Sequence, residues 1–457
     1  MKNILLLPLL SLFLISLSGF NTHAQSSFDV APANKLFYEL IATSDIEEAV
    51  LLLDQIDLDW SDRYIPMALE AIRFARSSSV RTALQGLLMQ KTGQSFIGLN
   101  DWYFWLWNEE IEAHPAYADF KASLYKNIDP RFETYFRDRL QTAQIRLDEV
   151  QWGGVLQDGI PPLRNPEMIN AGDAGYLGEN DVIFGIEING DARAYPKRIL
   201  AWHEMFTDTI GGEPIAGVYC TLCGTVIPYK TQTENGSFQL GTSGFLYRSN
   251  KLMYDQATQS LWSTVRGEPV IGPLVGQGIQ REHASVVTTT WNEWKTRHPD
   301  TTVLSLNTGH VRDYGEGVAY KEYFATDNLM FTTPFEDDRL DNKREVLALR
   351  FFAAPDQQLA IDTEFLKRNP IFEETIGRQN FVVLTDSSGA NRVYDPDGRN
   401  FVEYDGHKLL LDDTGASWRV EEERLVAENG EHLDRLPYHR AFWFGWQAAF
   451  PETRLIK

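Results

Sequence analysis

Several short sequence strings occur twice in the chain, in the same order, and this repetition limits the possible folds more than any other feature. The triplet Thr-Ile-Gly at 209–211 recurs at 375–377, and in each half it leads into a β-rich run. The pattern Trp-x-x-Trp at 291–294 recurs at 443–446, and a proline follows each pattern at the same interval. A further tryptophan follows an aspartate in both halves: Asp255 precedes Trp262, and Asp413 precedes Trp418. Ordered matches of this kind predict two copies of one folded unit.

The hydrophobic pattern changes along the chain and predicts its domains. Apolar residues recur at helical spacing at 46–53 and 64–74, whereas short β-rich runs with turn residues between them follow from about 181. The predicted class is α+β, with an N-terminal all-helical region followed by a duplicated, β-rich, mainly antiparallel α+β unit. The predicted segments are a signal peptide (1–24), a helical domain (25–149), a linker (150–180), a first β-rich copy (181–330, repeat 181–306) and a second copy (331–457, repeat 346–457).

The composition argues against a nucleic-acid partner. The 457 residues include 42 basic and 64 acidic side chains, which gives a formal net charge of -22. A nucleic-acid-binding protein needs a basic face, and no run of Lys and Arg here is longer than two residues. Phosphate-binding loops, H-E-x-x-H metal sites and G-x-S-x-G nucleophile elbows are also absent from the sequence. A serine hydrolase is therefore disfavoured, and whether the protein is an enzyme stays open.

The first residues resemble a secretory signal peptide. Lys2 is followed by an apolar stretch at 4–20 and then by a short segment that ends at Ala24. A charged start, an apolar core and a small residue before the cut are the parts of such a signal. The alternative is a signal anchor, because the apolar stretch is nearly long enough to span a bilayer. We expect cleavage after Ala24 and an exported protein, periplasmic or extracellular, that does not insert into the membrane.

The only two cysteines of the chain, Cys220 and Cys223, lie in the string Tyr-Cys-Thr-Leu-Cys-Gly. A disulfide between them closes a very small loop, so its entropic contribution to stability is small. A structural zinc site needs four ligands, usually from two such pairs, and only one pair exists. The spacing C-x-x-C in an exported chain fits thiol redox chemistry or soft-metal binding. A purely local disulfide or two buried thiols remain the alternative.

Three other residues are candidates for the same site. His203 and Glu204 lie in a predicted helix at 197–206, with His203 on the face towards the cysteine strand. Two thiolates, an imidazole and the thioether of Met253 would form a soft ligand set suited to copper. Glu204 could orient the imidazole or accept a proton. Alternatively, His203 is a hydrogen-bonded core histidine and Met253 is a core residue.

Two further histidines lie where the predicted fold could bring them near this site. His310 follows the repeat at 181–306 within the first copy, and His439 could reach across from the second copy or occupy a structural corner.

The two copies differ at the candidate residues. Counted from the Thr-Ile-Gly triplets, Cys220 aligns with Asp386, and Cys223 aligns with Gly389. His203 aligns with Arg368 or Asn369, depending on a small gap. The soft ligands therefore belong to the first copy alone, while the shared residues serve packing and turns.

Several strings of the β-rich part together resemble a known family. They occur in one order, at 183–196, 202–204, 219–225 and 253–255. The chain resembles the bacterial domain-of-unknown-function family 3179 over roughly residues 150–457. The resemblance implies one evolutionary unit that spans both copies, and it implies no activity or catalytic residue.

Three functions are compatible with these observations. The first is binding of a soft metal, with copper expected most, by Cys220, Cys223 and His203, with Met253 and Glu204 as further ligands. The second is a thiol–disulfide oxidoreductase in which Cys220 attacks, Cys223 resolves the mixed disulfide, and His203 lowers the pKa of the attacking thiol. The third is a carbohydrate- or protein-binding module without catalysis. Substrate, partner and oligomeric state do not follow from the sequence.

Overall fold

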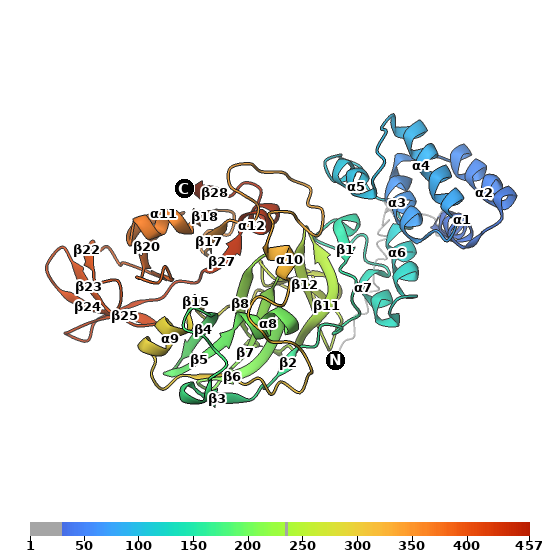
Figure 1. Ribbon diagram of the computed structural model, residues 1–457. Helices are drawn as coiled ribbons and strands as arrows, with labels where there is room; N and C mark the ends of the chain where they lie inside the picture. Colours follow the sequence, from blue (N-terminus) through green and yellow to red (C-terminus); the bar gives the residue numbers. More distant parts are fainter. Residues whose placement is uncertain (1–29, 234–235) are drawn as a thin grey trace, which may run out of the picture.

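The computed structural model describes residues 30–233 and 236–457, so the predicted signal peptide at 1–24 lies outside the described residues. A helical region, a first β-rich copy and a second β-rich copy follow one another along an elongated molecule (Figure 1). The α+β class is confirmed, since the helices are mostly N-terminal and the sheets that follow are mainly antiparallel. Within the described ranges, no helix is both long enough and apolar enough to span a bilayer.

The N-terminal region consists of short helices that pack on one another and on the first copy. Its apolar core includes Trp102 and Tyr125 and continues into the first copy through Phe245 and Tyr254. The helical region and the first copy therefore share one hydrophobic core. The helices are α1 (Val30–Ala42), α2 (Ile46–Leu58), α3 (Ile65–Phe74), α4 (Ser78–Thr92), α5 (Leu99–Trp107), α6 (Tyr117–Tyr125) and α7 (Glu133–Phe136), with short 3-10 turns at Asp62–Tyr64, Pro130–Phe132 and Leu147–Glu149.

The segment predicted as a linker, 150–180, contributes short strands to the first copy. Strand β1 (Val150–Trp152) pairs with β11 (Leu240–Tyr247), β2 (Leu163–Arg164) pairs with β6 (Met205–Ile210), and β3 (Met168–Asn170) pairs with β16 (Thr302–Leu304). A 3-10 turn at Ala171–Asp173 follows. Each of these strands lies at the edge of its sheet.

The first copy contains one small helix after its first hairpin and a second before its last strand. Asn189 and Gly190 form the predicted hairpin turn, both with positive φ. The elements are β4 (Val182–Ile188), β5 (Asp191–Pro196), α8 (Lys197–His203), β6 (Met205–Ile210), β7 (Glu213–Cys220), β8 (Thr225–Lys230), β9 (Gln232–Thr233), β10 (Gly236–Ser237), β11 (Leu240–Tyr247), β12 (Asn250–Asp255), β13 (Leu261–Ser263), β14 (Glu268–Ile271), β15 (Val287–Thr290), α9 (Trp291–Arg297) and β16 (Thr302–Leu304), followed by α10 (Lys321–Phe324).

The second copy repeats this order of elements. Its sheet β27-β17-β18-β28 matches β15-β4-β5-β16 of the first copy, including one parallel pair at the same place. The elements are β17 (Glu345–Arg350), β18 (Gln358–Asp362), α11 (Thr363–Arg368), β19 (Ile371–Ile376), β20 (Gln379–Thr385), β21 (Asn391–Tyr394), β22 (Phe401–Tyr404), β23 (Leu409–Asp412), β24 (Ser417–Val420), β25 (Arg424–Ala427), β26 (His432–Asp434), β27 (His439–Phe442), α12 (Trp443–Ala449) and β28 (Arg454–Ile456).

Buried tryptophans make the same hydrogen bonds in both copies. The indole nitrogen of Trp294 donates to the Thr301 hydroxyl at 2.9 Å, and that of Trp446 donates to Thr453 at 2.9 Å. These bonds explain why the strings around the tryptophan pairs recur, because each fixes a helix against the strand that follows it.

The second recurring tryptophan bond corrects one match made from the sequence. The indole of Trp262 donates to Asp255 (3.3 Å), and the indole of Trp418 donates to Asp412 (3.0 Å). The counterpart of Asp255 is therefore Asp412 and not Asp413, because the turn between the aspartate and the tryptophan is one residue shorter in the second copy, while the strand pairing is equivalent: Met253 pairs with Trp262, and Leu410 pairs with Trp418.

The two copies face each other with approximate two-fold symmetry. The corner between β7 and β8 packs on β27, where the Phe442 amide donates to the Cys223 carbonyl at 2.8 Å. The equivalent corner between β20 and β21 reaches β15, where the hydroxyls of Ser388 and Thr289 are 3.2 Å apart. Since β27 and β15 are equivalent strands, each copy presents the same corner to the same strand of the other. This arrangement is an isologous interface within a single chain.

Candidate functional site at the junction of the two copies

The two cysteines form a disulfide in the corner between β7 and β8. Strand β7 ends at Cys220, and β8 begins two residues after Cys223. Gly224 supplies a positive φ of 61°, which lets the chain turn back into β8. Cys220 is 2% exposed and Cys223 is 1% exposed, so the disulfide lies inside the protein.

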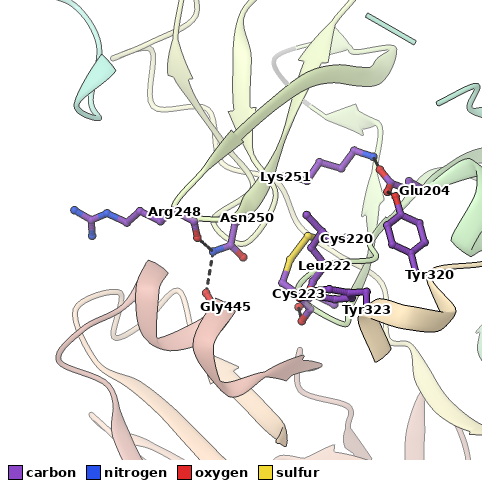
Figure 2. Close-up of a disulfide and its surroundings, with 11 residues drawn as sticks. Glu204, Cys220, Leu222, Cys223, Arg248, Asn250, Lys251, Tyr320, Tyr323 and Gly445 are labelled. Atoms are coloured by element: carbon purple, nitrogen blue, oxygen red, sulfur yellow. Dashed lines mark hydrogen bonds and ion pairs between the residues drawn. A yellow bond between two sulfur atoms is a disulfide. The ribbon is translucent and has the colours of Figure 1, made fainter. Parts of the chain in front are cut away.

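Segments from outside the first repeat cover the disulfide corner (Figure 2). The Tyr323 hydroxyl, on α10, donates to the Leu222 carbonyl at 2.7 Å. A Cβ atom at Gly445, on α12, would lie 2.7 Å from the Cβ of Cys223, so only glycine fits there. The disulfide is therefore a contact point between the two copies.

Asn250 connects the same corner to the second copy. Its side-chain nitrogen donates to the Gly445 carbonyl at 2.9 Å and to the Arg248 carbonyl at 3.2 Å (Figure 2). Its side-chain oxygen is buried and has no hydrogen-bond partner among the described residues. This oxygen and Cys223 flank the same position, because a Cβ atom at Gly445 would lie 3.5 Å from the oxygen and 2.7 Å from the Cβ of Cys223. A buried acceptor without a donor is uncommon in a folded protein and calls for an explanation.

A buried ion pair lies on the other side of the corner. The Lys251 ammonium donates to the Glu204 carboxylate, and the Tyr320 hydroxyl donates to the other carboxylate oxygen at 3.0 Å. The Glu204 carbonyl also accepts from the Tyr219 amide at 2.8 Å, which places this group beside the start of the disulfide turn. Burial, together with the charge of Glu204, raises the pKa of Tyr320 well above its usual range.

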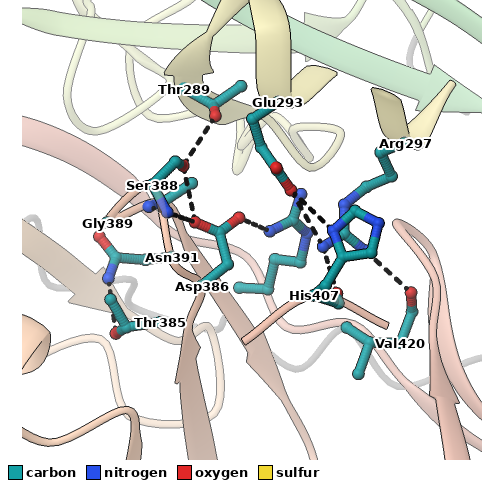
Figure 3. Close-up of polar contacts among 12 residues, drawn as sticks. Thr289, Glu293, Arg297, Thr385, Asp386, Ser388, Gly389, Asn391, His407 and Val420 are labelled. Atoms are coloured by element: carbon teal, nitrogen blue, oxygen red, sulfur yellow. Dashed lines mark hydrogen bonds and ion pairs between the residues drawn. The ribbon is translucent and has the colours of Figure 1, made fainter. Parts of the chain in front are cut away.

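The same corner of the second copy is closed without sulfur. Asp386, at the position of Cys220, accepts from the Ser388 amide (2.9 Å), the Ser388 hydroxyl (2.6 Å) and the Ala390 amide (3.0 Å). Its second oxygen accepts from Arg392 at 2.8 Å, and both side chains are buried. Figure 3 shows Asp386 beside Ser388 and Gly389 in this turn. Gly389, at the position of Cys223, supplies a positive φ of 86°. This scaffold can therefore build the corner with an aspartate cap in place of a disulfide.

A small cleft of about 160 Å³ lies between the two copies beside these corners. Tyr219 and Gly224, which flank the cysteines, form part of its wall, and Ser388 lines it from the second copy. Equivalent positions of the two copies face each other across it with different side chains: Val182 and Glu345, Thr288 and Arg440, Thr290 and Phe442. Lys197 adds a further charge at the rim, so the cleft is polar and chemically asymmetric.

The structure places His203 in a hydrogen-bond network of its own. Helix α8 ends at His203, and Glu204 adopts a positive φ of 56° before β6, so the predicted helix at 197–206 is too long. The two ring nitrogens of His203 lie 2.9 Å from the Pro161 carbonyl and 2.6 Å from the Tyr314 hydroxyl. Burial lowers the pKa of His203, which favours the neutral imidazole.

The other predicted residues also lie apart from the disulfide. Met253 packs in a core with Trp262, whereas the cysteines pack with Tyr323 and Phe442. His310 is exposed, although its ring lies 5.2 Å from that of His203. His439 does reach the first copy, but it contacts His283 there. Among the described residues, no group of three or more His, Cys, Asp or Glu side chains could hold a metal ion.

Sequence reasoning missed several residues that shape the site. Lys251 and Asn250 lie in a strand with no pattern that predicts a partner, and Tyr320 and Tyr323 lie in a segment outside the repeats. The sequence did contain one signal for Asp386. Counting from the two Thr-Ile-Gly triplets places Asp386 opposite Cys220. The turn-capping role of that aspartate could have been suggested from the Asp-Ser-Ser-Gly string that it begins.

The fold and this junction define a duplicated α+β protein with a disulfide corner between its halves. The chain belongs to the family described as Protein of unknown function (DUF3179), whose model matches residues 157–453. The match spans both copies, as the resemblance predicted. No curated protein and no solved structure matches the chain.

Proposed function

We propose that the protein is an exported dithiol–disulfide redox protein whose reactive couple is Cys220 and Cys223. One observation carries the proposal: the equivalent corner of the second copy is closed by Asp386, without any disulfide. A disulfide across four residues stabilises the chain by only about 2 kcal/mol on a loop-entropy argument. The fold therefore has little structural need for these two cysteines, and redox chemistry gives them a role.

The surroundings of the pair support a stable reduced state. When two electrons and two protons convert the disulfide to two thiols, a partner dithiol becomes oxidised to its own disulfide. A thiol at Cys223 would then lie near the buried oxygen of Asn250, which lacks a donor in the oxidised structure. A hydrogen bond formed only after reduction would stabilise the dithiol form relative to the disulfide.

Access to the buried sulfur atoms requires movement of the covering residues. The Tyr323 hydroxyl donates to the Leu222 carbonyl, and the Phe442 amide donates to the Cys223 carbonyl. The cleft between the copies reaches both flanks of the turn, at Tyr219 and Gly224. We propose that a partner thiolate approaches from this cleft, since residues on either side of the turn line it.

The soft-metal hypothesis now depends on the reduced cysteines alone. Thiolates select soft ions such as Cu(I), but both nitrogens of His203 already face other partners, and Met253 lies in a different core. The binding-module hypothesis has little support from aromatic residues, because none of the twelve tryptophans is exposed. Redox chemistry of the pair is therefore the function that the geometry supports best.

A redox titration of the folded protein tests the proposal. The purified protein is equilibrated in glutathione buffers of increasing reducing strength, the thiols are trapped by alkylation, and mass spectrometry counts the modified cysteines. We expect a reversible two-electron transition with one midpoint, while circular dichroism stays that of the folded state throughout. A pair that becomes reducible only after denaturation would contradict the proposal and leave a structural disulfide.

Two controls make the result specific. The Cys220→Ser/Cys223→Ser variant must show no alkylation change, which excludes an effect of the reagents. Adding Cu(I) to the reduced protein, in competition with a chelator of known affinity, separates the two chemistries. Stoichiometric copper binding combined with failure to cycle would favour the metal hypothesis over the redox one.

A further inference from the structure

A second junction between the copies concentrates buried polar groups that have no partners. A hollow of about 20 Å³ is lined by Arg281 and His283 from the first copy and by Arg350 and His439 from the second. Five buried side-chain nitrogens of these four residues make no hydrogen bond among the described residues: Nε and Nη2 of Arg281, Nδ1 of His283, Nε of Arg350 and Nε2 of His439. Native proteins leave only a few such groups unpaired per 100 residues, so a cluster of five around one hollow indicates a ligand.

The charges around this hollow are not balanced. Arg281 is 1% exposed, and no carboxylate of the described residues lies within 4 Å of Arg281 or of Arg350. Arg266, which also lines the hollow, pairs with Glu268 at 3.6 Å, while Glu268 and Asp356 act on Arg350 only from a greater distance. Asp255 acts on Arg281 from further away, and its oxygens accept from Thr258 and Trp262 instead. A buried cation without a counter-ion is costly, and an anion would remove that cost.

Aromatic rings hold Arg281 in place. Its guanidinium lies 4.5 Å from the ring centre of Phe238 and 4.7 Å from that of Trp262, and one terminal nitrogen donates to the Lys230 carbonyl at 2.8 Å. These contacts fix the side chain while leaving its remaining N–H groups free. A positioned guanidinium with free donors is the usual basis of anion recognition.

The two histidines contribute N–H donors in their neutral form. Their rings lie 6.4 Å apart, with His439 packed against Trp446. Burial lowers the pKa of His283 to about 4 and that of His439 to about 3, so both are neutral at physiological pH. Two arginines beside them disfavour a metal cation at the same place, because like charges repel at short range.

We infer that this hollow binds one small monovalent anion of the chloride type, held between the two copies by Arg281, Arg350 and His439. The volume suits one water-sized group and excludes phosphate esters and carboxylic acids. The bound anion joins the first copy to the second, since its donors come from both. This site is independent of the disulfide chemistry proposed above.

Thermal unfolding in halide-free and halide-containing buffers tests the inference. The full chain is titrated with sodium chloride against sodium gluconate at constant ionic strength, and the unfolding midpoint is recorded. We expect a saturating rise of the midpoint with chloride and with bromide. Equal midpoints in chloride and gluconate would overturn the inference, as would stabilisation by Zn²⁺ and not by halide, which would indicate a metal site at the histidines.

Substitutions test whether the chloride effect arises at this hollow. Arg350→Gln is the main variant, because Arg350 is only half-buried and its loss is tolerated more easily than that of Arg281. We expect its dissociation constant for chloride to rise at least ten-fold, whereas the exposed control Arg419→Gln keeps the wild-type value. An anomalous scattering peak of bromide in the hollow, in crystals of the wild-type protein, gives a second readout that does not depend on any variant. Its absence at saturating bromide would also overturn the inference.

Discussion

The two corners at the junction provide a direct comparison of a disulfide with an aspartate cap. We predict that Asp386→Ala destabilises the protein more than Cys220→Ser/Cys223→Ser does. Asp386 accepts three hydrogen bonds within its turn and pairs with Arg392, and its side chain is 0% exposed. Removing one partner of a buried ion pair costs about 3 to 5 kcal/mol, and the lower end applies here because Arg392 also pairs with Glu422 at 2.7 Å. Loss of a disulfide across four residues costs about 2 kcal/mol.

Guanidinium-induced unfolding, followed by tryptophan fluorescence, measures both losses. Asp405→Ala is the matched control, because Asp405 also accepts three hydrogen bonds within its turn, all from backbone amides, but is exposed and forms no ion pair with any described residue. We expect that control to lose about 1 kcal/mol, the usual value of a cap. If Asp386→Ala lost less than the control, or less than the cysteine variant, the argument that the scaffold closes this corner without sulfur would be refuted.

Three further predictions concern the disulfide surroundings, the buried histidines and His203. Asn250→Ala should lower the midpoint potential of the cysteine pair by about 20 mV, since it removes about 1 kcal/mol of hydrogen bonding from the reduced state alone; an unchanged midpoint in the glutathione titration would contradict this. Burial lowers the pKa of His283 to about 4 and that of His439 to about 3, whereas histidines of the unfolded chain titrate near 6.5. Below pH 6.5 the unfolded chain therefore binds more protons than the folded chain does. The free energy of unfolding should therefore fall as the pH is lowered from 6.5 towards 4, by about 1.4 kcal/mol per pH unit for each histidine. Replacing both histidines by Gln should flatten this slope of unfolding free energy against pH. If the reduced protein binds Cu(I), His203→Gln should leave the affinity within two-fold of wild type in a chelator competition, whereas a ten-fold loss would make His203 a ligand.

The duplication could be predicted from sequence because the residues that repeat are structural. Trp294 and Trp446 recur since each donates to a threonine that anchors the following strand. Such residues keep fixed spacing, so their order identifies the copies. The length of a turn was less predictable: the turn before Trp418 is one residue shorter than the turn before Trp262, so the counterpart of Asp255 was placed one residue too far along the second copy.

The candidate site was predicted only in part. The position of the cysteines at the end of a strand followed from the local pattern, but the path of the chain after His203 did not. Glu204 adopts a left-handed conformation that no local signal announces, and it directs its side chain to Lys251. The covering residues Tyr323 and Phe442 come from segments about 100 and 220 residues away along the sequence. Contacts between such distant segments depend on tertiary packing, which single-sequence patterns do not contain.

Hydrogen exchange of the oxidised and reduced protein tests the central claim most directly. The claim is that Cys220 and Cys223 can change redox state within the folded protein, and that the junction between the copies responds. After reduction we expect faster amide hydrogen exchange at 219–226 and 440–446, and unchanged exchange across the helices at 30–125. Reoxidation should restore the exchange rates of the oxidised protein. Identical exchange in both states, or a disulfide that resists reduction until the whole chain unfolds, would contradict it.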